Sequence, residues 1–133
     1  NYPEASQEYK NLSEALEQPA LFDHFLHFIH KFYDAQVPED ILNRDVRMPY
    51  QADERLLPVF LSIYQNNPPL QMLCELLVDL DEGFQEWRYR HVKMVERTIG
   101  SKSGTGGSAG IEYLKKSLFR SAFPDLWAVR NKF

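Results

Sequence analysis

A row of apolar residues at helical spacing is the feature of this sequence that most limits how the chain can fold. The row consists of Leu70, Leu73, Leu77, Leu80, Phe84, Trp87, His91 and Met94. Its intervals alternate between three and four residues, which keeps one face of a single helix pointed in one direction. We therefore predict one long helix over about residues 70–99, roughly 45 Å long at about 1.5 Å per residue. We also predict that this face points at a core along its whole length.

Helical patterns fill most of the remaining chain, and prolines separate them. We predict further helices over the ranges 4–18, 22–33, 39–43 and 52–66. Pro58 falls in the early turns of the last of these, or else kinks it. Two short helices are expected near the C-terminal end, and no alternating β-branched run predicts a strand. The sequence thus predicts an all-α fold for residues 1–133, a single helical bundle domain built around the long helix.

Charge and cysteine content exclude several classes of protein. The 133 residues carry a formal net charge of -4, which argues against a general nucleic-acid binder because such proteins usually have a basic surface. No stretch approaches the roughly 18 apolar residues of a membrane span. Cys74 is the only cysteine, so the chain can form neither an internal disulfide nor a cysteine metal cluster. We expect Cys74 to be an inert buried thiol, and a reducing, cytoplasmic location suits it.

His91 is the polar member of the apolar row, with Trp87 and Met94 one turn away on either side. An imidazole on an apolar face requires a partner for its nitrogens. One interpretation is a core histidine bonded to a backbone or carboxylate group. The other is an axial ligand to a flat apolar cofactor that contains iron, with the apolar neighbours shielding the ring. Spacing alone leaves both open. His24, His27 and His30 are instead expected to be polar neighbours of an apolar helix face rather than a metal site.

The segment from Gly100 to Gly110 holds five of the six glycines. Glycine permits close backbone approach to a ligand, and exposed N–H groups with the hydroxyls of Thr105 and Ser108 could hold a carboxylate or phosphate. The segment fits a loose dinucleotide-binding fingerprint, but that fingerprint requires a preceding strand, and here a long helix precedes it. A flexible surface connection remains the alternative.

Several of these pieces form one larger pattern. Its parts are Trp87-Arg88, His91, Met94, Ile99-Gly100, Gly104-Thr105-Gly106-Gly107-Ser108, Tyr113-Leu114 and Phe123-Pro124-Asp125-Leu126-Trp127. Together they resemble the tryptophan 2,3-dioxygenase family, and the combination is far more specific than any single part. The resemblance covers nearly all of this sequence, whereas the sequence covers only about half of the family's chain.

The resemblance implies a function and a set of site residues. The family binds heme b and inserts both atoms of O₂ across the indole C2–C3 bond of L-tryptophan, giving N-formylkynurenine in the first step of the kynurenine pathway. It implies that His91 is the axial ligand of the heme iron, with Trp87 and Met94 beside the cofactor. It also implies that Thr105, Gly106, Gly107 and Ser108 contact the substrate, within a loop over residues 101–109 that we expect to be mobile. A homotetramer is implied as well. Ala109 stands where the family usually has a second serine.

Other family residues have no counterpart here. The distal-side histidine and the arginine and tyrosine that grip the substrate lie in the family's N-terminal half, so we assign no catalytic residue within this chain. We predict that the isolated 133-residue chain does not turn over tryptophan, and that its partner is the N-terminal half. Arg88 and Arg90 either approach heme propionates or lie on a solvated helix face. Phe123 and Trp127 are expected to be packing anchors.

Two alternative functions remain open at this point. One is a cofactor-free helical interaction module in which His91 is a core residue. The other is a heme-binding helical protein with a non-catalytic role, such as transport or sensing.

Overall fold

Helices make up all the regular structure of the described chain. The structure, a computed structural model, describes residues 20–99, 112, 115 and 120–133. Its elements are α2 (Leu21–Tyr33), α3 (Glu39–Leu42), the 3-10 helix η1 (Glu54–Leu56), α4 (Leu57–Asn66), α5 (Pro68–Ile99), α7 (Pro124–Ala128) and the 3-10 helix η2 (Val129–Lys132). The all-α prediction and the long helix are confirmed. The predicted helix over 4–18 and the glycine-rich segment 101–109 lie outside the described residues.

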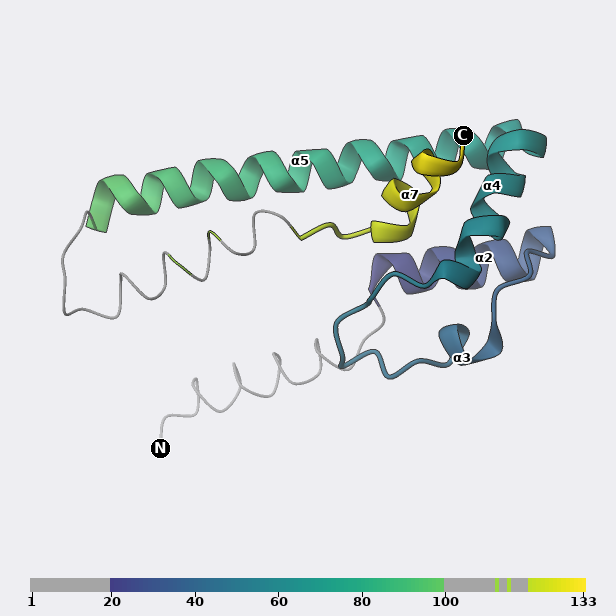
Figure 1. Ribbon diagram of the computed structural model, residues 1–133. Coiled ribbons are helices and arrows are strands. Elements are labelled where there is room, and N and C mark those ends of the chain that lie inside the picture. Colours follow the sequence, from purple (N-terminus) through teal and green to yellow (C-terminus); the bar gives the residue numbers. More distant parts are fainter. Residues whose placement is uncertain (1–19, 100–111, 113–114, 116–119) are drawn as a thin grey trace.

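The long helix α5 forms a rod, and the other helices gather against one half of it (Figure 1). It contains 32 residues, or about 48 Å at ~1.5 Å per residue. Among the helices in the described ranges, none is both long and apolar enough to cross a membrane. The shared core is drawn from every nearby element and includes Phe22, Leu26, Ile29, Leu56, Phe60, Leu70, Cys74, Phe123, Leu126 and Val129.

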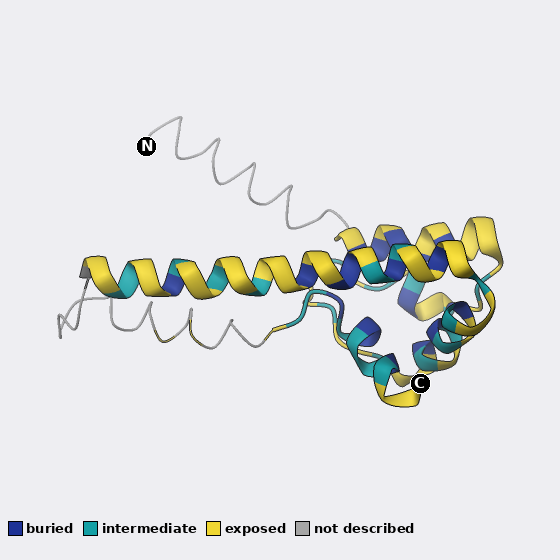
Figure 2. Ribbon diagram, turned by 90° about the horizontal axis from the view of Figure 1, so that it is seen from above, coloured by how far each residue is buried: buried dark blue, intermediate teal, exposed yellow. Residues whose placement is uncertain are grey.

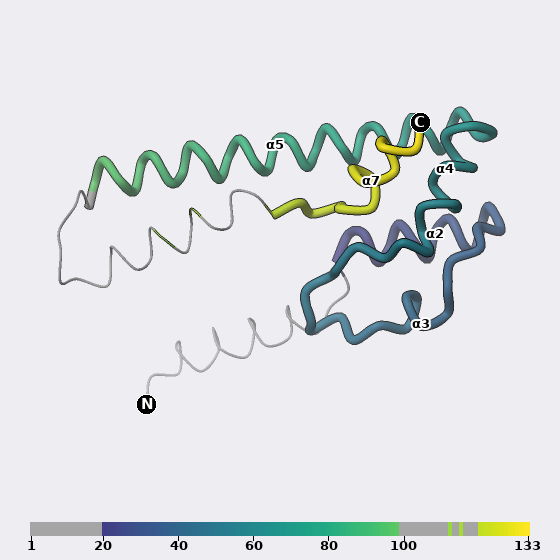
Figure 3. The backbone as a smooth tube through the Cα atoms, viewed as in Figure 1, coloured from purple at the N-terminus to yellow at the C-terminus, as the bar shows by residue number. Residues whose placement is uncertain are grey.

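The C-terminal segment returns antiparallel to α5 (Figure 3). Three contacts define its course: Arg88 donates to the carbonyl oxygen of Arg120 at 2.6 Å, Asp81 accepts from Ser121, and Glu75 pairs with Arg130 at 2.6 Å. As the chain advances from 120 to 130, its partners on α5 move back from 88 to 75. This segment therefore covers one side of the rod.

Prolines place two of the helix starts. Pro58 lies in the first turn of α4, where a missing N–H costs nothing because that group has no partner inside the helix. Pro68 and Pro69 similarly form the first turn of α5, and the side chain of Asn67 accepts from the backbone N–H of Leu70 at 3.2 Å. The prolines that were expected to separate the two helices are thus also the beginning of α5.

The prediction that the apolar row faces a core along its whole length is wrong. Leu70 and Leu77 are buried, but Leu80, Phe84, Trp87 and Met94 are exposed. The side of α5 that this chain covers is displaced by about one residue around the helix, and its buried members are Cys74, Val78, Asp81 and Val92. The cause is the C-terminal segment, which packs on that neighbouring side. Figure 2 shows the result, with buried residues concentrated where α5 lies beside other helices.

Candidate functional site

The displaced packing leaves an open face on the C-terminal half of α5. We use "the open face" for the exposed or half-buried residues Leu80, Phe84, Trp87, His91 and Met94. The indole of Trp87 is 63% exposed, so solvent or a ligand can reach this face. Val92, the next residue after His91, is buried on the other side of the rod. The helix therefore turns one side towards the chain's own core and the other, with His91, away from it.

The imidazole of His91 is fixed by an aromatic neighbour. It stacks on the indole of Trp87, with ring centroids 5.0 Å apart and planes inclined by 6°. No residue in the described part of the chain forms a hydrogen bond with either of its nitrogens. A half-buried imidazole with an oriented ring, whose nitrogens bond to none of the described residues, is suited to bind a metal ion through an unprotonated nitrogen.

The histidines of α2 provide a contrast. The Nε2–H of His27 donates to the carbonyl oxygen of Leu42 at 2.8 Å, and the Nδ1–H of His30 donates to that of Ala35 at 3.1 Å. Both rings therefore hold the connections that follow α2 in place. This agrees with the expectation that they serve as polar neighbours of an apolar helix face. His91 has no comparable bond within the described residues.

Asp81 anchors the C-terminal segment to α5, three turns before His91. Its carboxylate is fully buried and accepts four hydrogen bonds, from Ser121 Oγ (2.6 Å), Ala122 N (2.9 Å), Phe123 N (3.0 Å) and Trp127 Nε1 (2.9 Å). Burial alone would raise the pKa of Asp81, but these four donors outweigh it and hold the pKa below its usual value.

Sequence reasoning did not single out Asp81. Its position, three residues after Val78 and seven after Cys74, was the available signal. Phe123 is buried and the indole of Trp127 donates to Asp81, so the prediction that these two aromatic residues anchor the packing is confirmed. Cys74 is also buried as expected, and burial raises the pKa of its thiol to about 12.

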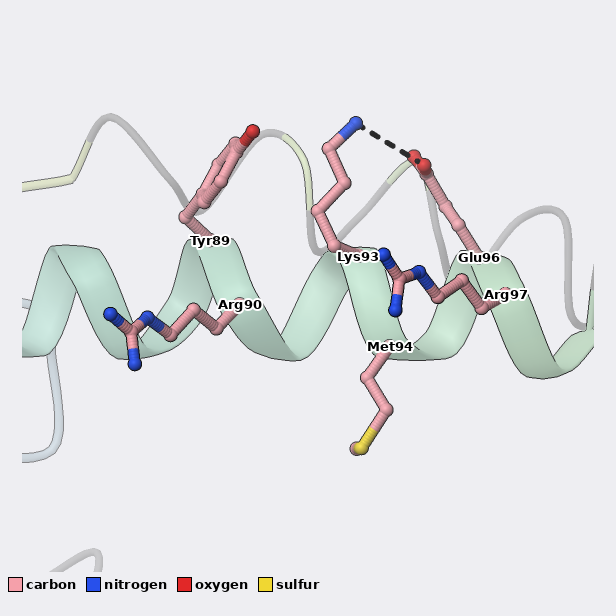
Figure 4. A pocket seen from close by; sticks show the side chains of 6 residues that line it. All are labelled: Tyr89, Arg90, Lys93, Met94, Glu96 and Arg97. Carbon is pink, nitrogen blue, oxygen red and sulfur yellow. Dashed lines mark hydrogen bonds and ion pairs between the residues drawn. The ribbon is translucent and has the colours of Figure 1, made fainter.

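Basic residues line α5 beyond the open face. An open groove of about 780 Å³ is lined by Tyr89, Arg90, Lys93, Met94, Glu96 and Arg97, and Figure 4 shows that these side chains leave the one helix in different directions. Lys93 lies 3.5 Å from Glu96, which also pairs with Lys115 at 3.0 Å. Arg90 pairs with Glu86 at 2.8 Å and is exposed. This groove does not enclose a ligand, but it places positive charge next to the open face.

The predicted site residues fall into two groups, the substrate-contacting loop and the cofactor contacts on α5. Thr105, Gly106, Gly107 and Ser108 lie outside the described residues, as does the loop 101–109. Of the predicted cofactor contacts, Trp87 and His91 touch each other, and Met94 lies one turn further on the same face. Arg88 does not share that face, because its guanidinium donates to the carbonyl oxygen of Arg120.

Comparison with known proteins gives one consistent result. The family model described as tryptophan 2,3-dioxygenase matches residues 4–133. A tryptophan 2,3-dioxygenase of Anaeromyxobacter dehalogenans is 50% identical over 132 residues, covering 98% of this chain and 48% of the relative. One of Herpetosiphon aurantiacus is 47% identical over 122 residues, covering 92% and 46%. The chain thus spans about half the length of the curated relatives it matches.

Proposed function

This chain belongs to the tryptophan 2,3-dioxygenase family, and on that premise we propose that it is the heme-binding half of such an enzyme, with His91 as the axial ligand of the iron. The observation that carries the proposal is the state of the His91 ring, which is stacked on Trp87, faces away from the core and has no hydrogen bond to a described residue. A structural core histidine would have its nitrogens satisfied by protein groups.

The residues around His91 fit a heme. A porphyrin is flat and apolar with two carboxylates at one edge, and the open face supplies apolar side chains in Trp87 and Met94, one turn on either side of His91. Arg90 lies one turn before Met94, is exposed and pairs with Glu86 at the surface, so its charge can also reach carboxylates near that face. Bound heme would supply the iron chemistry by which O₂ is inserted into the indole C2–C3 bond of L-tryptophan, giving N-formylkynurenine at the start of the kynurenine pathway.

The chain's own residues have three roles in this proposal. His91 contributes an unprotonated nitrogen, and the Trp87 stack holds the plane of its ring. The buried anchor at Asp81 holds α5 in one rotation about its axis, so that the His91 side stays free. Thr105, with Gly106, Gly107 and Ser108, binds the carboxylate and ammonium groups of tryptophan, a role that the family resemblance suggests and that glycine-rich backbone suits.

The complete site needs other chains or segments. The half of the family's chain that this sequence does not span is the proposed source of the distal side of the heme pocket and of the rest of the substrate site. We propose a homotetramer as the assembled form and the cytoplasm as its location.

A hemin titration tests the proposal. The 133-residue chain is titrated alone and when co-expressed with the remaining half of the 50% identical relative, and the Soret absorption is followed. We expect His91→Ala to abolish the ligand-specific band and His24→Ala, a matched change at an exposed histidine of α2, to leave it unchanged. Persistence of the band in His91→Ala would overturn the assignment, and no hemin binding in either form would leave a cofactor-free helical module.

A second readout separates catalysis from simple heme carriage. Adding L-tryptophan to the assembled, heme-loaded protein should shift the spectrum, and Thr105→Ala should weaken that response. Heme binding without any response to tryptophan would favour a transport or sensing role.

A further inference from the structure

We infer that the Met72–Phe84 stretch of α5 is a docking surface for an apolar helix with basic flanks, supplied by the half of the family's chain that this sequence does not span. This inference rests on the proposed function and adds the place and the chemistry of the partner. We call the surface formed by Met72, Leu76, Leu80, Gly83 and Phe84 the acidic docking surface, because it lies on the part of α5 that contains acidic residues and no Lys or Arg.

The acidic docking surface is apolar and uncovered by the described chain. Met72 is 68% exposed, Leu76 57%, Leu80 39% and Phe84 42%. Their spacing of four residues keeps these side chains on one side of the helix. The row continues into Trp87 and His91 of the open face. Four large apolar side chains in one uninterrupted row exceed the scattered exposure that is normal for a protein surface.

Gly83 makes a notch near the C-terminal end of this row, between Leu80 and Phe84. A Cβ at this position would meet nothing within 4 Å, so the chain's own packing does not require a glycine. Glycine in a helix interior costs about 1 kcal/mol relative to alanine. An open groove of about 610 Å³ lies there, lined by Asp79, Leu80, Gly83, Phe84 and Trp87. The notch allows another backbone to approach α5 closely, as small residues do where helices cross.

The charges along α5 indicate the chemistry of the partner. From Pro68 to Trp87 the helix contains no Lys or Arg and five acidic residues, whereas from Arg88 to Arg97 it contains four basic residues and one acidic residue. Asp79 borders the docking surface as a lining residue of the groove at Gly83, and within the described residues it has no ion pair. An apolar helix with Lys or Arg on its flanks would cover the row and neutralise this carboxylate.

A second copy of this chain fits less well. Two copies packed through Met72–Phe84 would place acidic flank against acidic flank, which is unfavourable. An antiparallel pair shifted to match acidic with basic residues would centre near Trp87 and cover His91, which the proposed function requires to be free. The relatives' chains contain about as much sequence again outside the matched half, and that half is the occupant to which we commit.

Docking is measured without heme, so that it does not depend on activity. The half of the 50% identical relative outside the match is expressed separately, and its Kd for this chain is determined at about 50 mM and about 500 mM salt. We expect Gly83→Leu, which fills the notch, and Asp79→Lys each to raise the Kd about tenfold or more. The charge variant should also lessen the salt dependence of the Kd. The matched control Glu39→Lys changes one exposed acid elsewhere and should leave the Kd unchanged.

A chimera provides a second measurement if the separate half does not fold. This chain replaces the matched half of the relative, and the urea midpoint is compared between the chimera and the 133-residue chain. Gly83→Leu should lower the midpoint of the chimera only, because in the shorter chain it fills open space and improves helix propensity. Equal effects in both proteins would overturn the inference.

The possible failures are distinguishable. If the docking variants leave the Kd unchanged while hemin binding still depends on His91, this inference is wrong and the proposed function stands. If the docking variants behave as expected but His91→Ala retains the Soret band, the proposed function fails instead. Formation of a homodimer that Gly83→Leu abolishes would identify a second copy as the occupant and overturn the inference.

Discussion

The two halves of α5 differ in what covers them. Between Pro68 and Asp81 the helix is held by the chain's own core, with Leu70, Cys74 and Val78 buried. Between Glu82 and Thr98 only Val92 is buried, and the large apolar side chains there are exposed (Figure 2). Helical periodicity is the same in both halves. The comparison teaches that periodicity identifies a helix with an apolar face, while the identity of the covering group depends on the rest of the assembly.

The largest expected effect is the absence of catalysis, because the second half of α5 has no covering residues in the described chain. We predict that the isolated 133-residue chain, supplied with heme and ascorbate, forms no N-formylkynurenine, because no residue described here covers the open face. Product formation is followed by absorbance, with the complete 50% identical relative as the positive control. Clear turnover by the isolated chain would mean that its own residues complete the site, and the contrast between the halves would lose its functional meaning.

Asp81→Ala should be the most destabilising change in the covered half. It leaves the four groups that donate to this carboxylate, including Phe123 N and Trp127 Nε1, without their acceptor in a buried place. We expect the free energy of unfolding to fall by about 3–5 kcal/mol, measured by urea denaturation. Asp79→Ala, two residues away and exposed, is the control and should change it by less than about 0.5 kcal/mol. A similar loss in both variants would show that the anchor contributes little.

A pair of leucines on α5 tests the comparison directly. Leu70 is 2% exposed and Leu80 is 39% exposed. Leu70→Ala should cost about 2–4 kcal/mol because it removes buried side-chain volume, whereas Leu80→Ala should cost less than about 1 kcal/mol in the isolated chain. Urea midpoints of the two variants give the difference. Equal costs would mean that the second half of α5 is covered by residues of this chain after all.

These contrasts indicate how far the sequence could lead. The length of α5, the helical class and the packing roles of Phe123 and Trp127 follow from periodicity and composition. The buried side of α5 could not be predicted in this way. Apolar residues occupy two neighbouring sides of the helix, and the local pattern does not indicate which of them the chain itself covers. Asp81 was missed since its four donors come from residues 121–127, some forty positions away in the chain. His91 was singled out because an imidazole interrupts an apolar row, and its proposed role as a ligand came from the family resemblance.

The pH dependence of stability should separate two buried carboxylates. Hydrogen bonds hold the pKa of Asp81 below its usual value, so its ionised form stabilises the fold above about pH 4 and that contribution is lost as the pH falls through its folded pKa. Burial raises the pKa of Asp125, which among the described residues accepts hydrogen bonds from Tyr50 Oη and Asp53 N. Its contribution has the opposite sign and is lost as the pH rises through its raised pKa.

Urea denaturation between about pH 3 and pH 6 measures both effects. We expect Asp81→Asn to flatten the rise of stability with pH, and Asp125→Asn to steepen it. Each variant is compared with the unsubstituted chain at every pH, so a loss that does not vary with pH cancels. Slopes that change in the same direction would contradict the opposite signs assigned to the two groups.

The smallest expected effect belongs to the uncovered half. Glu86 and Arg90 form an (i, i+4) pair at 2.8 Å, with side chains 64% and 77% exposed. Solvent screening limits such a pair to about 0.3–0.5 kcal/mol, so Arg90→Ala should change the free energy of unfolding by about that amount, and less at high salt. Arg130→Ala is the matched comparison, because Arg130 pairs with Glu75 across two elements, from a less exposed position, and its loss should cost more. If Arg90→Ala cost as much as Arg130→Ala, the exposed end of α5 would hold itself together by local charge pairs. Its stability would then not depend on a covering partner, because the ion pairs along its surface would already supply what the missing contacts are expected to provide.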